Sequence, residues 1–242
     1  MPSKLDLKKL NVEFEKASAV ALLQWALKEF SPKITLASSF GAEDVVLIDI
    51  LAKLETKIRV LTLDTGRLNE ETYEVMDKVR KKYGIRIESY FPDAAAVEKL
   101  EKQKGFYSFR ESVENRKECC GIRKLEPLKR ALKGMDAWVT GLRRSQSASR
   151  ESVQKIEADA AHPGLYKVNP LVDWSEADVW NYIKKNQVPY NRLHDLGYPS
   201  IGCEPCTRAV KPGEDIRSGR WWWENPDHKE CGIHESRPKK SP

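Results

Sequence analysis

The chain lacks any long hydrophobic run, and it has no repeated or low-complexity segment. Its 242 residues are 40% hydrophobic and 32% charged, and no apolar stretch approaches the roughly 20 residues that a membrane-spanning helix needs. The first ten residues lack the apolar core and cleavage site of a secretory signal. We therefore expect no membrane partner and a cytoplasmic location, where the five cysteines are more often metal ligands or catalysts than disulfides.

A strong charge of either sign is also missing. The 42 Lys and Arg residues against 36 Asp and Glu residues give a net charge of +6. A nucleic acid and a small polyanionic substrate would both suit such a charge, and so would an ordinary solvated surface with a modest excess of Lys. Charge alone leaves these three interpretations open.

Alternating strand and helix patterns predict an α/β fold with a mainly parallel sheet flanked by helices. The predicted strands cover 33–37, 58–63, 85–90 and 136–140, and the predicted helices cover 5–30, 43–54, 69–83, 93–104, 110–132 and 175–186. Ser175, with Asp178 three residues later, is a good start for the last helix. The periodicity weakens after about residue 145. We predict one α/β domain over 1–210 and a loop-rich, mobile C-terminal segment over 211–242 that acts as a lid.

Three motifs follow predicted strands. They are Ser38–Asp44, Leu63–Gly66 and Gly141–Ser147. In open α/β sheets, ligands bind at the carboxyl ends of strands, and N–H groups at a helix start attract phosphate or sulfate. Arg143, Arg144 and Arg150 add guanidinium groups, which bind such anions bidentately. The simpler interpretations are serine-capped turns and a basic surface.

Four of the five cysteines occur in two close pairs. Cys119 and Cys120 are adjacent, and Cys203 and Cys206 form a C-x-x-C, so the four thiols suit a tetrahedral metal or an iron–sulfur site. Neighbouring side chains on a helix diverge, and binding both members of the first pair therefore requires a local distortion. A cluster several Å wide tolerates that better than a single ion. Structural zinc and a redox-active C-x-x-C stay open.

The fifth cysteine, Cys231, lies between Lys229 and His234. Nearby cations favour the thiolate, which is the nucleophilic form, although a bystander cysteine is an equal alternative. The preceding triplet Trp221–Trp223 suits a lid anchor or a docking site, and we expect at least one of its rings in the core. His194 is more often a hydrogen-bonded structural histidine than a catalyst.

Together these motifs resemble the adenosine 5′-phosphosulfate (APS) reductase branch of the assimilatory sulfonucleotide reductases. The matching segments are Ser38–Asp44, Leu63–Leu68, Cys119–Lys124, Gly141–Ser147, Asn169–Trp174, Pro189–Thr207, Asp215–Glu224 and Lys229–His234, which span nearly the whole chain. The ATP pyrophosphatases, which are relatives of this family, carry a Ser-Gly-Gly-x-Asp-Ser phosphate loop. The different loop at Ser38–Asp44 argues against ATP hydrolysis.

The resemblance implies an adenine nucleotide α-hydrolase-like fold, a 4Fe–4S cluster on Cys119, Cys120, Cys203 and Cys206, and Cys231 as the nucleophile. The Cys231 thiolate would attack the sulfur of APS, expel AMP and form an S-sulfocysteine, from which a thioredoxin or glutaredoxin would release sulfite in sulfate assimilation. The candidate substrate-binding residues are Ser38, Ser39, Phe40, Gly41, Leu63, Asp64, Thr65, Gly66, Lys124, Gly141, Arg143, Arg144, Gln146, Arg217, Arg220 and His234.

Two alternatives remain at this point. The first is use of 3′-phospho-APS (PAPS), alone or beside APS; that branch generally lacks the cluster cysteines, so we prefer APS. The second is a zinc-stabilised nucleic-acid-binding module, with Trp residues for base stacking. This module leaves Cys231 and the strand-end motifs unexplained, so we expect no nucleic-acid partner. A homo-oligomer is left open.

Overall fold

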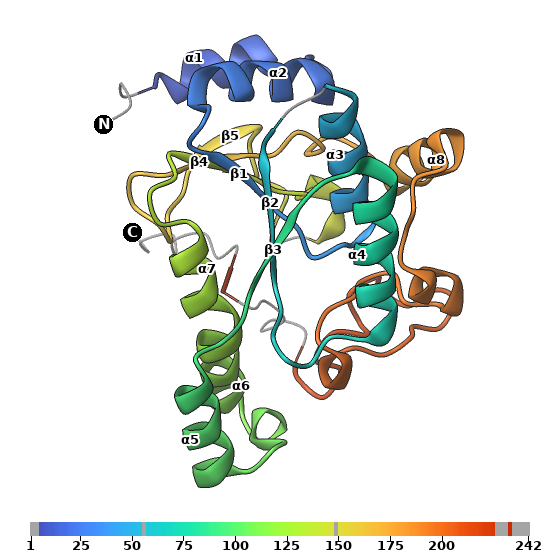
Figure 1. Ribbon diagram of the computed structural model, residues 1–242. Coiled ribbons are helices and arrows are strands. Elements are labelled where there is room, and N and C mark those ends of the chain that lie inside the picture. Colours follow the sequence, from blue (N-terminus) through green and yellow to red (C-terminus); the bar gives the residue numbers. More distant parts are fainter. Residues whose placement is uncertain (1–4, 55–56, 148–149, 226–231, 234–242) are drawn as a thin grey trace, which may run out of the picture.

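The computed structural model describes residues 5–54, 57–147, 150–225 and 232–233 (Figure 1). The strands are β1 (Ile34–Ala37), β2 (Arg59–Leu63), β3 (Ile87–Tyr90), β4 (Ala137–Val139), β5 (Ile156–Ala158) and β6 (Tyr166–Val168). The α-helices are α1 (Leu7–Phe14), α2 (Ala19–Phe30), α3 (Ala42–Lys53), α4 (Glu70–Tyr83), α5 (Ala94–Lys104), α6 (Val113–Cys120), α7 (Glu126–Ala131) and α8 (Glu176–Asn186).

One six-stranded sheet runs through the described residues in the order β3-β2-β1-β4-β6-β5. All neighbouring pairs are parallel except β5 with β6. The sequence-based prediction of an α/β fold with a mainly parallel sheet is confirmed. Strand β1 lies between β2 and β4. After β1 the chain forms β2 and β3 on one side of it, and then crosses to form β4 on the other side. Such a switch in strand order opens a crevice at the carboxyl ends of the strands.

The main core lies between the sheet and the helices α2, α3, α4 and α8. Helix α3 is buried along almost its whole length, including Val45, Val46 and Leu47, as expected of a helix that is apolar on all sides. A smaller apolar cluster joins α7 to β4 through Leu128, Leu132 and Trp138. Figure 1 shows α5 and α6 at the opposite end of the molecule from α1 and α2, with α7 above them.

Two predicted helices are interrupted. The segment 5–30 forms α1 and α2, because Ser18 accepts a hydrogen bond from the Ala21 N–H and begins a new helix. The segment 110–132 contains the end of a 3-10 turn (η1, Ser108–Arg110), then α6, a π-helical turn (η2, Gly121–Leu125) and α7. The predicted capping box at the start of α8 is present.

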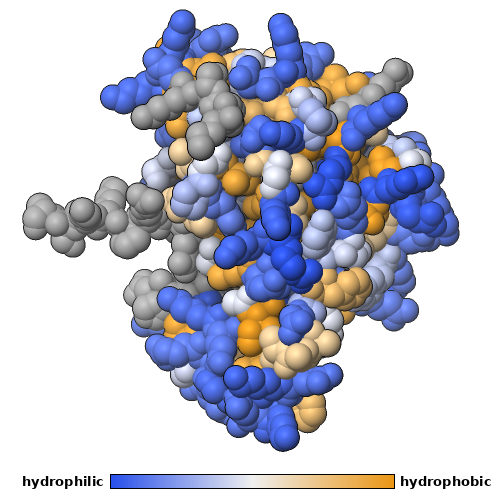
Figure 2. All heavy atoms as spheres, turned by 60° about the vertical axis from the view of Figure 1, so that its left-hand side comes forward, coloured by the Kyte–Doolittle hydropathy of each residue, from blue (hydrophilic) through white to orange (hydrophobic). Residues whose placement is uncertain are grey.

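The short strands β5 and β6 were missed, because three residues are too few to show a periodic pattern. Along the described ranges, no helix has the length and apolarity required to cross a membrane. Figure 2 shows a face of the molecule that is mostly hydrophilic, with hydrophobic atoms exposed in small areas between charged side chains.

Candidate active site

A cavity of about 240 Å³ lies at the carboxyl ends of β1, β2 and β4. The loop after each of these strands contributes to its walls, and the C-terminal part of the chain closes it from the other side. The predicted site residues that line it are Ser38, Ser39, Gly41, Leu63, Thr65, Lys124, Gly141, Arg143, Gln146, Arg217 and Arg220. The cavity therefore sits at the switch point of the sheet and gathers residues from across the sequence.

The loop after β1 folds around a buried carboxylate. Asp44 accepts hydrogen bonds from the Ser39 backbone N–H at 2.6 Å and from the Ser39 hydroxyl at 2.8 Å. Burial raises the pKa of Asp44 to about 6, against the opposing effect of these hydrogen bonds. Phe40 adopts a left-handed backbone conformation (φ 58°) and its ring is fully buried. It anchors the loop in the core and does not line the cavity.

The loop after β4 packs directly on this first loop. A Cβ atom built at Gly141 would lie 2.6 Å from Asp44 Oδ1 and 2.8 Å from Glu43 Cβ. Real Cβ atoms do not approach other atoms so closely, so only glycine fits here. Gly141 thus acts by allowing two strand-end loops to meet.

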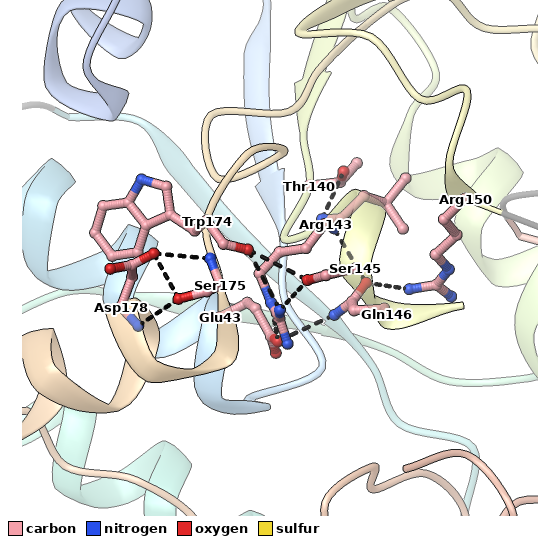
Figure 3. Close-up of polar contacts among 10 residues, drawn as sticks. Glu43, Thr140, Arg143, Ser145, Gln146, Arg150, Trp174, Ser175 and Asp178 are labelled. Carbon is pink, nitrogen blue, oxygen red and sulfur yellow. Dashed lines mark hydrogen bonds and ion pairs between the residues drawn. The ribbon is translucent and has the colours of Figure 1, made fainter. Parts of the chain in front are cut away.

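A polar network holds the arginine-rich segment at the cavity wall (Figure 3). Arg143 Nε donates to Glu43 Oε1 at 2.8 Å, and Gln146 Nε2 donates to the same oxygen at 3.0 Å. Gln146 in turn accepts hydrogen bonds from the Arg143 backbone N–H and from Arg150. Arg144 points elsewhere, because its Nε donates to the Val153 carbonyl oxygen at 2.8 Å, and it does not line the cavity.

The cavity is rich in positive charge. Five basic side chains line it against two carboxylates, those of Glu43 and Asp44. The basic residues are Lys124, Arg143, Arg150, Arg217 and Arg220. Because one carboxylate is paired with Arg143 and burial favours the protonated form of the other, the balance suits a ligand with more than one negative charge.

The loop after β2 links this cavity to the cysteines. Asp64 accepts a hydrogen bond from the Gly66 N–H, and the single Tyr73 hydroxyl proton is shared between its two carboxylate oxygens, so Asp64 holds the turn without lining the cavity. Gly66, with φ at 70°, takes the left-handed conformation that the turn requires. Thr65 lines the cavity, and its hydroxyl lies 3.2 Å from the Cys203 sulfur.

All four predicted ligand cysteines line one smaller cavity next to the first. They are free thiols. Cys119 and Cys120 end α6, and the π-helical turn begins immediately after them. This is the kind of local distortion that the adjacent pair was expected to need, and π-turns occur frequently at functional sites.

The charges around these thiols differ. Burial alone would raise the pKa of Cys203, but the Lys124 charge, the Thr65 hydroxyl and two guanidinium groups bring it below its ordinary value. Burial raises the pKa of Cys119, and burial together with the Cys203 thiolate raises the pKa of Cys206 to about 12. The protein therefore favours the thiolate of Cys203, whereas ionisation of Cys119 and Cys206 requires an added positive charge.

Two buried N–H groups without a hydrogen-bond partner line the cysteine cavity. Among the described residues, no three His, Cys, Asp or Glu side chains are gathered closely enough to hold a single metal ion. Trp221 Nε1 and Arg123 Nε are buried without a hydrogen-bond partner in the same part of the chain, and both residues line the cavity. N–H groups left in this way fit an acceptor with negative charge, such as the sulfides of an iron–sulfur cluster.

The C-terminal part of the chain contributes to the strand-end cavity. Trp221 is 1% exposed, so at least one ring of the Trp triplet lies in the core, as predicted. Ile233 lines the cavity and packs against the cluster of Leu128 and Trp138. The predicted residues Cys231 and His234 lie outside the described residues.

Sequence reasoning missed several lining residues. Glu43 and Asp44 were part of the first motif but were given no role, and His194 was set aside although it lines the cavity. Trp138 carried no signal, because a tryptophan in a predicted strand indicates only a core position.

Comparison with known proteins agrees with the geometry. Residues 33–209 match the family model described as "Phosphoadenosine phosphosulfate reductase domain". The chain is 53% identical over 218 residues to an adenosine 5′-phosphosulfate reductase of Allochromatium vinosum, covering 90% of this chain and 84% of that protein. It is 47% identical over 239 residues to one of Pseudomonas aeruginosa, covering 97% and 88%.

The solved phosphoadenylyl-sulfate (PAPS) reductase of Candida auris, in a phosphate complex, superimposes with a TM-score of 0.73 at 31% identity. The superposition covers 87% of this chain and 100% of the Candida auris chain. The sheet order, the strand-end cavity and this likeness agree with the adenine nucleotide α-hydrolase-like fold. The chain therefore belongs to the phosphoadenosine phosphosulfate reductase family.

Proposed function

We propose that this protein reduces adenosine 5′-phosphosulfate to sulfite and AMP in sulfate assimilation. The observation that carries the proposal is the composition of the strand-end cavity, where five basic side chains and Ile233, two residues after Cys231 in the chain, line the same space. Relatives at 53% and 47% identity are named as APS reductases. A thiol nucleophile next to a cation-rich nucleotide site suits sulfuryl transfer.

The proposed reaction has two stages. The Cys231 thiolate attacks the sulfur of APS, an S–S bond forms, and the S–O bond to the phosphate breaks, so that AMP leaves with the electron pair. A thiol of reduced thioredoxin then attacks the Cys231 sulfur and releases sulfite. This attack leaves a mixed disulfide between Cys231 and thioredoxin. The second thioredoxin thiol breaks that bond, releases the Cys231 thiolate and closes the thioredoxin disulfide, which accounts for the two electrons that the sulfur gains. A glutaredoxin dithiol would do the same work.

The basic residues stabilise the charge that moves in the first step. Negative charge spreads over the sulfuryl oxygens and the leaving phosphate, and fixed cations such as Lys124, Arg217 and Arg220 are already in place before the reaction. Preorganised charges of this kind lower the barrier because they need no reorientation in the transition state. The loops at Ser38 and Leu63 would hold the adenosine.

The names of the relatives favour APS over PAPS as the substrate. The relatives at 53% and 47% identity are named adenosine 5′-phosphosulfate reductases, whereas the PAPS reductase of Candida auris is 31% identical.

Cys119, Cys120, Cys203 and Cys206 would hold a 4Fe–4S cluster. The unpartnered N–H groups of Trp221 and Arg123 and the stabilised Cys203 thiolate support this assignment. The cluster would supply structure and a local electrostatic field, because the thiol chemistry itself requires no electron from it. The need for reduced thiols would place the protein in a reducing compartment.

The test is sulfite release from APS with reduced thioredoxin, compared between the wild type and Cys231→Ser. We expect the variant to lose turnover and to keep its iron content and its affinity for AMP. PAPS in place of APS tests the substrate preference. Sulfite production by Cys231→Ser at the wild-type rate would overturn the nucleophile, and zinc in place of iron and sulfide would favour the nucleic-acid-binding alternative.

A further inference from the structure

Trp221 lines both the nucleotide cavity and the cysteine cavity. Its side chain is buried, and two guanidinium groups pack on its ring. The Arg116 guanidinium carbon lies 4.8 Å from the ring centroid, and the Arg220 guanidinium carbon lies 4.6 Å from it. Arg116 comes from α6, the helix that ends in the cysteine pair, whereas Arg220 lines the nucleotide cavity.

A buried ion pair fixes Arg116. Its Nε and Nη2 atoms donate to the two Glu224 carboxylate oxygens, each at 2.9 Å, and the two side chains are 1% and 4% exposed. The Glu224 backbone N–H also donates to the Trp221 carbonyl oxygen at 2.9 Å. This pair therefore ties the segment 221–224 to the middle of α6.

A buried ion pair of this kind fixes the relative positions of the two segments more than it adds to the stability of the fold. The desolvation of a buried ion pair offsets much of its Coulomb attraction, so the pair makes a small net contribution. Trp221 meanwhile has φ at 41°, a conformation that is rare for a bulky residue and persists only where the surroundings enforce it. Arg116 contacts the Trp221 ring, and the Glu224 backbone N–H donates to the Trp221 carbonyl oxygen.

Arg220 contacts the Trp221 ring on one side and the segment 200–202 on the other. Its Nη1 atom donates to the Ser200 hydroxyl at 3.4 Å and to the Ile201 carbonyl oxygen at 3.3 Å. A Cβ atom at Gly202 would lie 2.3 Å from Arg220 Nη2, so the guanidinium lies directly against this glycine. Removing the Trp221 support would let Arg220 shift within the cavity.

We propose that Arg116 is a positioning residue for the anion end of the nucleotide cavity. Paired with Glu224, it fixes the Trp221 ring, and the ring fixes Arg220 where the sulfate of the substrate binds. This inference rests on the proposed function for the identity of the ligand. Its consequence is selective: loss of Arg116 weakens the binding of ligands with a charged group at the sulfate position and spares adenosine.

The test compares the dissociation constants of ADP and adenosine by isothermal titration calorimetry, with iron and sulfide measured in each preparation. ADP carries a phosphate where APS carries its sulfate. For Arg116→Met and Glu224→Gln we expect the ADP dissociation constant to rise about tenfold, as for one misplaced charge-assisted hydrogen bond. Adenosine binding should change by less than about twofold, since its contacts lie elsewhere.

The matched control is Arg130→Gln, because Arg130 also forms an ion pair with a glutamate, Glu126, but on the surface of α7. Exposed pairs contribute little, so this variant should bind ADP as the wild type does. The double variant Arg116→Met/Glu224→Leu removes both buried charges. We expect it to recover thermal stability while ADP binding stays weak.

The outcomes separate the two proposals. If the wild type prefers ADP to adenosine and the Arg116 and Glu224 variants keep that preference, the positioning role is wrong and the proposed function stands. An ADP affinity that simply follows thermal stability or iron content across all variants would show a structural role and also overturn the positioning. Failure of the wild type to bind either ligand would overturn both proposals.

Discussion

The nucleotide cavity and the cysteine cavity share Lys124, Cys203 and Trp221, but the chain builds them in different ways. The nucleotide cavity comes mostly from short loops that each follow one strand, so a local motif places each residue. The cysteine cavity joins the end of α6 to segments about 85 and 100 residues later, and it is held by long-range contacts such as the ion pair of Arg116 with Glu224. Local motifs therefore specify the first site, and tertiary packing specifies the second.

The largest expected effect is on the cysteine cavity. Cys203→Ser, which removes one of the proposed ligands, should reduce bound iron and sulfide to background, because a serine hydroxyl is a poor ligand where a thiolate is stabilised. Metal and sulfide analysis checks this, with Cys231→Ser as the control that keeps its iron. Adenosine binding should persist in both variants. Its loss in Cys203→Ser would mean that the two cavities form a single unit.

The second prediction concerns Asp44 in the nucleotide cavity, whose pKa is raised from 3.8 to about 6 by burial. The unfolded state ionises first as the pH rises, so this group makes the native state less stable between about pH 4 and 6. The loss levels off above the folded pKa. From the pKa difference it amounts to at most about 3 kcal/mol.

Asp44→Asn should lack this dependence, so its stability relative to the wild type should rise across the same interval. Urea unfolding at several pH values between 4 and 8 measures the free energy of unfolding of both proteins. Other titrating groups contribute equally to both, so they cancel in the difference between the variant and the wild type. A stability difference that is constant with pH would contradict the buried, neutral-favouring environment of Asp44.

A smaller effect is expected where the two strand-end loops meet. Gly141→Ala forces its Cβ against Asp44 and Glu43, and a displacement of these loops should weaken ADP and adenosine binding alike by about tenfold, the scale of a modest overpacking. Iron content should not change. Gly121→Ala is the control, because a Cβ there meets no described atom within 4 Å. Equal effects of the two substitutions would refute the close packing of the loops.

The same contrast explains what the sequence could predict. Strand and helix periodicity identified β1 to β4 and most of the helices, and several residues that follow β1, β2 and β4 line the cavity. Arg144 was grouped with Arg143 because both follow β4, but adjacent side chains point in different directions and only Arg143 reaches Glu43. Phe40 was grouped with its loop, although its ring supports the loop from the core.

The missed features depend on tertiary structure. The pairing of Arg116 with Glu224 joins residues 108 positions apart, and no local pattern marks either partner. The short strands β5 and β6 exist because β6 completes the sheet beside β4, and their three residues carry little periodic signal of their own. The adjacent cysteines did predict a distorted helix, and the π-helical turn after them shows its form.

The measurement that tests the central claim most directly is a mass map of the protein after incubation with APS and no reductant. The enzyme, purified without oxygen and shown to hold iron and sulfide, should gain one sulfo group, and digestion should locate it on Cys231. An adduct that forms with PAPS but not with APS would contradict the substrate assignment. No adduct with either nucleotide, or an adduct on another cysteine, would contradict the proposed sulfuryl transfer to Cys231.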